Sequence, residues 1–160
     1  MSKTPASVWR NPVHFLAFGF GSGAAPWAPG TFGTLAAIVI YLLLWQHLSL
    51  VYYLSLLIFS VVAGIYICHI TARDLKVHDH SGIVWDEMVG IWLTLFAIPP
   101  HSVWIIFGFL LFRLFDIWKP YPIRYLDKHV HGGWGIMLDD IIAGIFAGII
   151  LHSIIYFYTT

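Results

Sequence analysis

The stretch LSLVYYLSLLIFSVVAGIYICHI, from Leu48 to Ile70, decides the fold class of this chain. It is 23 residues long and contains no Asp, Glu, Lys or Arg. A helix needs about 20 apolar residues to cross the hydrocarbon core of a bilayer. The stretch therefore predicts a transmembrane helix, and the rest of the sequence is interpreted around it.

Two other uncharged runs, Ala28 to Trp45 and Ile141 to Tyr158, are also long enough to span a membrane. Two shorter apolar segments, Met88–Ile98 and Ser102–Phe112, are separated by Pro99-Pro100-His101. Each of these segments covers roughly half of a bilayer at about 1.5 Å per residue. They cross the membrane only if their flanking residues extend them, and otherwise they form a re-entrant helical hairpin.

The composition agrees with a membrane protein. Hydrophobic residues make up 59% of the 160 residues and charged residues 10%, against roughly 45–50% and 25% in soluble domains. Lys and Arg balance Asp and Glu at 8 each, so the basic excess that is typical of nucleic-acid binding is absent. We predict an all-α integral membrane bundle with four to five membrane helices, two of them short or re-entrant.

We expect residues 1–160 to form one membrane-embedded domain, in which residues 1–27 are an N-terminal interfacial segment. The first 14 residues are polar and mixed, without the apolar core of a cleaved signal peptide. Nothing in the sequence requires an obligate protein partner.

The positions of the charged residues predict how the chain is oriented in the membrane. They fall into four stretches, which are Lys3–Arg10, Arg73–Glu87, Arg113–Lys128 and Asp139-Asp140. With five crossings, all four stretches and the glycine-rich loops lie on one side of the membrane. Lys and Arg favour the cytoplasmic side, so we expect the N-terminus inside and the C-terminus outside.

Acidic side chains adjoin apolar sequence in three of these stretches, where ionisable groups are costly and therefore indicate function. The residues are Asp86, Glu87, Asp116, Asp139 and Asp140. Carboxylates that converge repel one another, and a divalent cation with a preference for oxygen ligands, such as Mg²⁺, relieves the repulsion.

Each acid also has a structural interpretation. Asp139 and Asp140 would begin the last long apolar helix, where a carboxylate is favoured as a cap. Asp116 could pair with Arg113 or Lys119, three residues away on the same helical face.

A group of bases surrounds Pro120 and Pro122, which predict a rigid bend rather than a helical stripe. The bases are Arg113, Lys119, Arg124 and Lys128. In a bend beside carboxylates they could hold a phosphate, or they could attract the surface of an anionic membrane.

Two glycine-rich segments complete the pattern. Pro29-Gly30-Thr31-Phe32-Gly33-Thr34 leads into a predicted helix, where backbone N–H groups and the hydroxyls of Thr31 and Thr34 could bind an anion. The alternative is an entry turn with Thr31 or Thr34 as the N-cap. The second segment, Gly132 to Gly135, is expected to be a loop that turns the chain back into the membrane.

Four blocks of this sequence resemble the phosphatidylglycerophosphatase A family. They are APGTFGT (28–34), GIVWDEMVG (82–90), FRLFDIWKPYPI (112–123) and GGWGIMLDD (132–140). The resemblance covers most of the chain. It implies an all-helical, Mg²⁺-dependent enzyme of the bacterial inner membrane that removes the terminal phosphate of phosphatidylglycerol phosphate, a phospholipid in the bilayer, to give phosphatidylglycerol.

With this resemblance, the residues suggest a mechanism. Mg²⁺ would be held by Asp86, Glu87, Asp116 and Asp140, with Asp139 as a further ligand or a cap. The phosphate would be bound by Lys119, Arg124, Arg113, Thr31 and Thr34. The residues assigned to catalysis are Asp86, Asp116, Lys119 and Arg124. Water would attack the phosphorus, or an Asp nucleophile would form a phospho-enzyme.

Without the resemblance, two other classes of protein are also compatible with these acidic residues in apolar sequence. A small transporter or channel subunit could use the carboxylates as an ion relay. A structural membrane subunit could use them in ion pairs that anchor its helices.

Overall fold

The computed structural model describes residues 4–77 and 80–159, and all regular elements in these ranges are helical. The α-helices are α1 (Pro12–Ala17), α2 (Pro29–Leu43), α3 (Leu50–Asp74), α4 (Trp85–Thr94), α5 (Ser102–Trp118), α6 (Ile123–His129) and α7 (Gly132–Thr159). Three short 3₁₀ turns are η1 (Ala6–Trp9), η2 (Ser22–Ala24) and η3 (Trp45–His47). The all-α prediction is confirmed.

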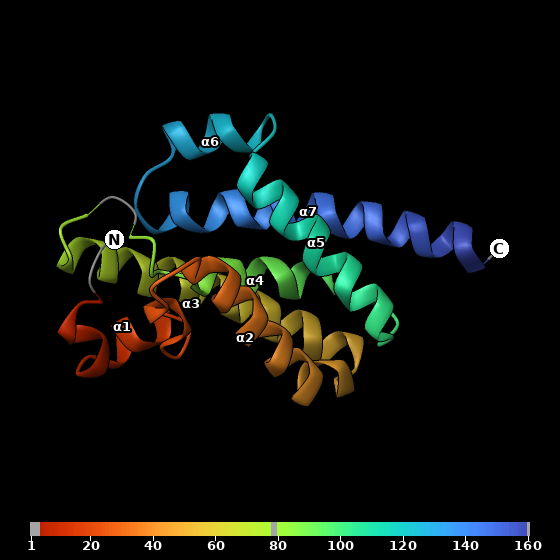
Figure 1. Cartoon of the computed structure of the whole chain (residues 1–160), viewed down its shortest axis with the longest axis horizontal. Coiled ribbons are helices and arrows are strands. Elements are labelled where there is room, and N and C mark those ends of the chain that lie inside the picture. The colour runs from red at the N-terminus through yellow and green to blue at the C-terminus, as the bar shows by residue number, and fades with distance from the viewer. Residues whose placement is uncertain (1–3, 78–79, 160) are drawn as a thin grey trace.

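Three helical stretches are long and apolar enough to cross a membrane. They are α2 together with η3, α3, and α7. Figure 1 shows α7 running along the long axis of the molecule, with the C-terminus at one extreme. The other two helices of the bundle are shorter, with 10 residues in α4 and 17 in α5. The structure is thus consistent with a helical membrane bundle, and the crossing of the membrane by α4 and α5 stays a prediction.

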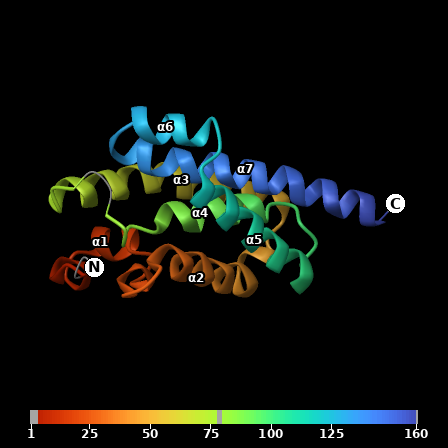
Figure 2. The ribbon, with the colours of Figure 1, turned by 45° about the horizontal axis from the view of Figure 1, so that its top comes forward.

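Helix α4 is the centre of the bundle (Figures 1 and 2). Eight of its 10 residues are buried, and it packs against α2, α3, α5 and α7. The ring of Trp92 stacks on Trp45 at a centroid distance of 4.3 Å, and its Nε1 donates a hydrogen bond to the carbonyl oxygen of Ala37. Because protein covers this short helix on several sides, its ends do not need to reach both surfaces of the bilayer to satisfy their backbone.

Helix α5 continues past the apolar segment Ser102–Phe112 and stops at Trp118, so the flanking residues extend it. Arg113 and Asp116 extend it because they pair with each other across one helical turn. Lys119 is the C-cap residue of this helix, and it takes a left-handed conformation with φ of 46° just before Pro120. The predicted bend is real but shorter than expected, because the chain re-enters a helix at Ile123.

The start of α7 corrects two predictions. The helix begins at Gly132, so the glycine segment 132–135 is its first turn and not a loop. A Cβ atom on Gly133 would lie 1.9 Å from the carbonyl oxygen of Ile65 on α3. Glycine is needed because the two backbones touch there. Asp139 and Asp140 therefore lie two turns inside the helix, and the interpretation of either as its cap is wrong.

The described part of the N-terminal segment packs against the bundle. Val8, Ala17 and Phe18 are fully buried, and α1 lies against α3. Buried His14 lies 3.0 Å from Ser7 Oγ and 3.4 Å from Asp74 Oδ2, so it joins the segment to the end of α3. Residues 1–3 of the predicted interfacial segment lie outside the described residues.

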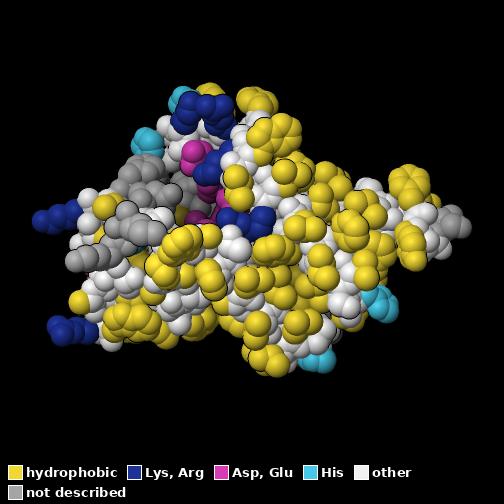
Figure 3. Space-filling view, viewed as in Figure 1, with side chains coloured by type: hydrophobic (Ala, Val, Ile, Leu, Met, Phe, Trp, Pro, Cys, Tyr) yellow, Lys and Arg dark blue, Asp and Glu magenta, His cyan; other side chains and the backbone are white. Residues whose placement is uncertain are grey.

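The described parts of the charged stretches gather at one end of the molecule. Figure 1 places the starts of α2, α4 and α7 and the ends of α3 and α5 at the end opposite the C-terminus. On the face shown in Figure 3, the Lys, Arg, Asp and Glu side chains occupy that end and the other end is largely hydrophobic. This arrangement is the one that the five-crossing interpretation requires. The side of the membrane on which this end lies stays a prediction.

A glycine contact sets the distance between α4 and α7. A Cβ atom on Gly144 would lie 2.6 Å from the carbonyl oxygen of Gly90. The hydroxyl oxygen of Thr94 lies 2.9 Å from Gly90 O and 3.3 Å from Gly144 O, which ties the two helices together at the same point. The helices that carry Asp86, Glu87 and Asp140 are thus held in close contact.

We expect Gly144→Ala to destabilise the protein by about 1–3 kcal/mol, the usual cost of overpacking a tight contact. The matched control is Gly148→Ala, one turn further along α7, where a Cβ would be in ordinary contact at 3.5 Å from Thr94 O. That change should be neutral or slightly stabilising, because Ala favours a helix more than Gly does. Thermal unfolding of the two variants in detergent measures the difference, and equal midpoints would contradict the close-contact explanation.

Candidate active site

Three carboxylates from two helices meet at the charged end of the bundle. Asp86 and Glu87 lie in the first turn of α4, and Asp140 reaches them from α7. Each residue offers one oxygen atom, and these three atoms lie within 4.8 Å of one another. Asp140 is only 2% exposed and Asp86 9%. Helix packing has therefore brought Asp140 to two acids that precede it by more than 50 residues in the sequence.

This group of oxygens fits a hard divalent cation. Opposite oxygens around an octahedral Mg²⁺ are about 4.2 Å apart, given metal–oxygen distances of about 2.1 Å. Glu87 Oε2 is buried without a hydrogen-bond partner among the described residues, and Asp139 Oδ1, from the position next to Asp140, is in the same situation. Buried carboxylate oxygens without partners are costly. The residues present therefore suit a bound cation.

Arg113 brings Asp116 to the edge of this group. Its Nη1 donates to Asp116 Oδ2 and lies 4.0 Å from Glu87 Oε1. All three side chains are largely buried, with side-chain exposures of 14–15%. Of the two partners that the sequence left open for Asp116, the structure selects Arg113. Asp116 lies outside the three-oxygen group but borders it, because its carboxylate pairs with Arg113 and interacts with the side chain of Asp140.

Lys119 connects α6 with α7. Its ammonium group donates to Asp139 Oδ2 at 2.5 Å and to Asp127 Oδ1 at 2.9 Å. Burial opposes the charged form of Lys119, but Asp139 and Asp127 outweigh that effect and raise its pKa above the ordinary value of a lysine. Lys119 is therefore a permanent positive charge next to Asp139.

The sequence interpretation missed Asp127. It lies eight positions after Lys119 with two prolines between them, so no helical spacing connects the two. They meet because the chain turns at Pro120–Pro122 and folds α6 back against α7. The only signal in the sequence was that an acid lies inside a group of bases.

The start of α2 also reaches the acids. A Cβ atom on Gly30 would lie 2.2 Å from Glu87 Oε1 and 3.2 Å from Arg113 Nη1, so only glycine lets these side chains approach. Thr31 is half-buried in the first turn of α2. Thr34 is fully buried, and its hydroxyl donates to Gly30 O inside the helix. The N-cap is Ala28, so the interpretation of either threonine as the cap is wrong.

Arg124 lies on α6, away from the three-oxygen group. It is exposed, and it shares a pocket of about 630 Å³ with Lys119 and Lys128. The predicted rigid bend thus contains a helix, which carries Arg124, Asp127 and Lys128. Figure 3 shows Lys and Arg side chains at this edge of the molecule, with acidic side chains between them.

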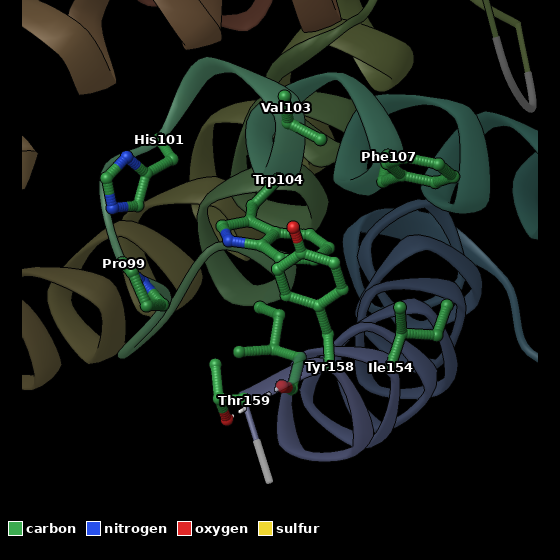
Figure 4. A pocket seen from close by; sticks show the side chains of 9 residues that line it. Pro99, His101, Val103, Trp104, Phe107, Ile154, Tyr158 and Thr159 are labelled. Carbon is green, nitrogen blue, oxygen red and sulfur yellow. Dashed lines mark hydrogen bonds between the residues drawn. The ribbon is translucent and has the colours of Figure 1, made fainter.

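A second pocket, of about 610 Å³, lies at the opposite end between α5 and α7. Figure 4 shows Trp104 and Tyr158 next to each other in its lining, with His101 at its edge. Apart from His101 and the hydroxyls of Tyr158 and Thr159, its lining side chains are apolar. It contains no acid and offers no group for phosphate chemistry, so the charged end is the candidate active site.

The comparisons with known proteins identify a family over most of the chain. The family model of phosphatidylglycerophosphatase A matches residues 15–155. The chain is 52% identical to phosphatidylglycerophosphatase A of Escherichia coli (strain K12), over 90% of this chain and 84% of that protein.

Two further relatives are similar over most of their lengths. The chain is 47% identical to phosphatidylglycerophosphatase A of Haemophilus influenzae, over 91% of this chain and 90% of that protein. It is 39% identical, over 83% and 87%, to a protein of Bacteroides thetaiotaomicron that is named as a candidate phosphatidylinositol-3-phosphatase. No solved structure matches the chain.

Proposed function

The chain belongs to the phosphatidylglycerophosphatase A family, and from this premise we propose that it hydrolyses the terminal phosphate of phosphatidylglycerol phosphate to give phosphatidylglycerol. Its relatives carry the name of this activity. The observation in the structure that supports the proposal most strongly is the meeting of Asp86, Glu87 and Asp140. Such a group suits a metal-assisted phosphatase.

We propose Mg²⁺ as the cofactor, held by Asp86, Glu87 and Asp140. When bound, it supplies positive charge against the phosphoryl oxygens. Arg113 would keep Glu87 and Asp116 in place, because it contacts both side chains. Lys119, fixed by Asp139 and Asp127, would stabilise the negative charge of the terminal phosphate. Thr31 would line the same site from the start of α2.

The reaction is a displacement at phosphorus. Water attacks the phosphorus, the bond from phosphorus to the glycerol oxygen breaks, and a proton passes to that oxygen, which leaves as the hydroxyl of phosphatidylglycerol. We propose water rather than an Asp side chain as the nucleophile, because Asp116 and Asp139 are engaged with bases, and we assign Asp86 and Asp140 to the metal. Detection of a phosphorylated Asp after rapid quenching would overturn this assignment.

We place the enzyme in the bacterial inner membrane with its site on the cytoplasmic side. On the face shown in Figure 3, the bases lie at the same end as the carboxylates. Lys and Arg in short loops are retained on the cytoplasmic side.

We expect purified protein in detergent to release phosphate from phosphatidylglycerol phosphate with Mg²⁺ and to lose this activity in EDTA. Asp116→Asn should lower the rate at least about tenfold, because Arg113 loses its charged partner beside Glu87. Phosphate release and protein folding are measured on the same samples. A folded protein that releases no phosphate would contradict the proposal, and ion flux in liposomes would then test the alternative of an ion relay.

A further inference from the structure

A pocket on α6 is left unexplained by the hydrolysis of one phosphate. It has a volume of about 630 Å³ and lies at the turn from α5 to α6. Its lining residues are Trp118, Lys119, Pro120, Tyr121, Arg124, Tyr125, Lys128 and His129. We call it the α6 pocket. It combines bases with aromatic rings at the charged end of a membrane protein.

Two of the bases in the α6 pocket are available for a ligand. Arg124 and Lys128 are four residues apart on α6, so they lie on the same helical face. Both are exposed, and neither forms a salt bridge with any residue that the structure describes. Asp127, the acid between them in sequence, is already paired with Lys119. The face therefore carries two positive charges that no nearby acid of α6 neutralises.

The rings place the pocket at the depth of lipid headgroups. Trp118 is 68% exposed and Tyr121 is 83% exposed. Large exposed aromatic side chains next to bases are typical of the interface between a membrane and water. Tyr125 stacks on His129 at a centroid distance of 4.1 Å, which gives this face of α6 a fixed aromatic surface. An anionic lipid headgroup fits such surroundings better than a soluble ligand does.

Lys119 belongs both to the α6 pocket and to the candidate active site. It lines the pocket, and its ammonium group contacts Asp139, the neighbour of Asp140. A ligand with two phosphates joined by a short linker would therefore have one binding region on each side of Lys119. Phosphatidylglycerol phosphate has this form, with a terminal monoester and an inner phosphodiester separated by one glycerol.

We propose that Arg124 and Lys128 in the α6 pocket bind the inner phosphodiester of the substrate while its terminal phosphate lies at the carboxylates. The proposal rests on the proposed function and adds a determinant of specificity to it. It explains why the chain would prefer a lipid with two phosphates over phosphatidic acid, which has a monoester and no diester. Charged hydrogen bonds to phosphate supply the discrimination.

The first test compares two substrates. In neutral detergent micelles with Mg²⁺, kcat/KM is measured for phosphatidylglycerol phosphate and for phosphatidic acid. We expect the double variant R124Q/K128Q to lower the ratio of the two values about tenfold, mainly through KM for phosphatidylglycerol phosphate. Lys76→Gln, an exposed base of the same end outside the pocket, is the matched control and should leave the ratio unchanged.

The second test uses the product as a probe. Phosphatidylglycerol retains the phosphodiester and lacks the monoester, so it should inhibit the wild-type enzyme competitively. The inhibition constant should rise about tenfold in R124Q/K128Q, whereas diacylglycerol at the same mole fraction, which carries no phosphate, should not inhibit either protein.

The outcomes distinguish a failure of the α6-pocket proposal from a failure of the proposed function. If R124Q/K128Q lowers the rates for both substrates equally, the bases only attract an anionic surface, and the proposal is wrong. An unchanged substrate ratio and an unchanged inhibition constant would also overturn it. If the wild-type protein does not hydrolyse phosphatidylglycerol phosphate at all, the proposed function fails first.

Discussion

Asp140→Asn is expected to lower the rate of phosphate release at least about 100-fold, since even the outer partners of a bound metal are typically worth 10–100-fold. Asp140 is the one carboxylate that α7 contributes to the three-oxygen group, and it is almost completely buried. Asn keeps the shape of the side chain but removes one of three negative charges. A cation would then be held by the acids of α4 alone.

Although Asp140→Asn should lower the rate, it should not lower the stability of the protein without metal. Three buried carboxylates repel one another, so removing one charge should leave the unfolding midpoint in EDTA unchanged or higher. Mg²⁺ should raise the midpoint of the wild-type protein, because a ligand at 100 times its Kd stabilises by about 2.7 kcal/mol. In Asp140→Asn this rise should largely disappear.

Thermal unfolding in detergent, with EDTA and with Mg²⁺, measures both effects on one sample. Asp74→Asn is the matched control, because Asp74 pairs with Arg73 and His14 and is not part of the three-oxygen group. It should keep the rise in midpoint with Mg²⁺ and most of the activity. An Asp140→Asn protein with the wild-type rate and the wild-type Mg²⁺ effect would show that the three-oxygen group does not hold the metal.

Lys119→Met should have the second large effect, on stability and on activity together. Lys119 is the partner of Asp139 Oδ2, and Asp139 Oδ1 has no partner among residues 4–77 and 80–159. Breaking a buried ion pair from one side costs roughly 3–5 kcal/mol. Because the side chain of Lys119 is 27% exposed, we expect a loss of about 2 kcal/mol. The rate should fall at least about tenfold because the terminal phosphate loses a positive charge.

The double variant K119M/D139N separates the two effects. It removes both charges of the pair, so it should recover much of the unfolding free energy that Lys119→Met loses. The rate should stay low, since the methionine supplies no charge to the phosphate. Unfolding midpoints and phosphate release of the single and double variants measure the two effects. A double variant no more stable than Lys119→Met would show that the pair with Asp139 does not stabilise the fold.

The prediction from sequence succeeded for features that depend on the hydropathy of one continuous segment, such as the long apolar helices. The run from Leu48 to Ile70 became α3, and the uncharged runs on either side became α2 and α7. Hydropathy over about 20 residues sets the cost of leaving water, whatever the neighbours are. The described parts of the four charged stretches, for the same reason, lie at one end of the bundle, and the acids were correctly singled out as unusual.

The prediction failed where a contact between helices overrides local preference. Gly132 to Gly135 has the composition of a loop, but the segment is helical because its glycines allow α7 to approach the backbone of α3 at Ile65. The bases after Pro122 were expected in a bend, but α6 forms there and packs on α7. Neither contact can be read from the segment that makes it.

The sequence alone therefore determined the fold class, the helix order and the end of the molecule that carries the charges. Only the tertiary structure decided which acids meet in the three-oxygen group and which acids pair with bases. Asp86 and Glu87 meet Asp140, while Arg113 takes Asp116 and Lys119 takes Asp139. This division depends on how each helix is rotated and how closely it approaches its neighbour. The Gly90–Gly144 contact fixes the approach between α4 and α7, and such long-range packing has no signature in any one segment.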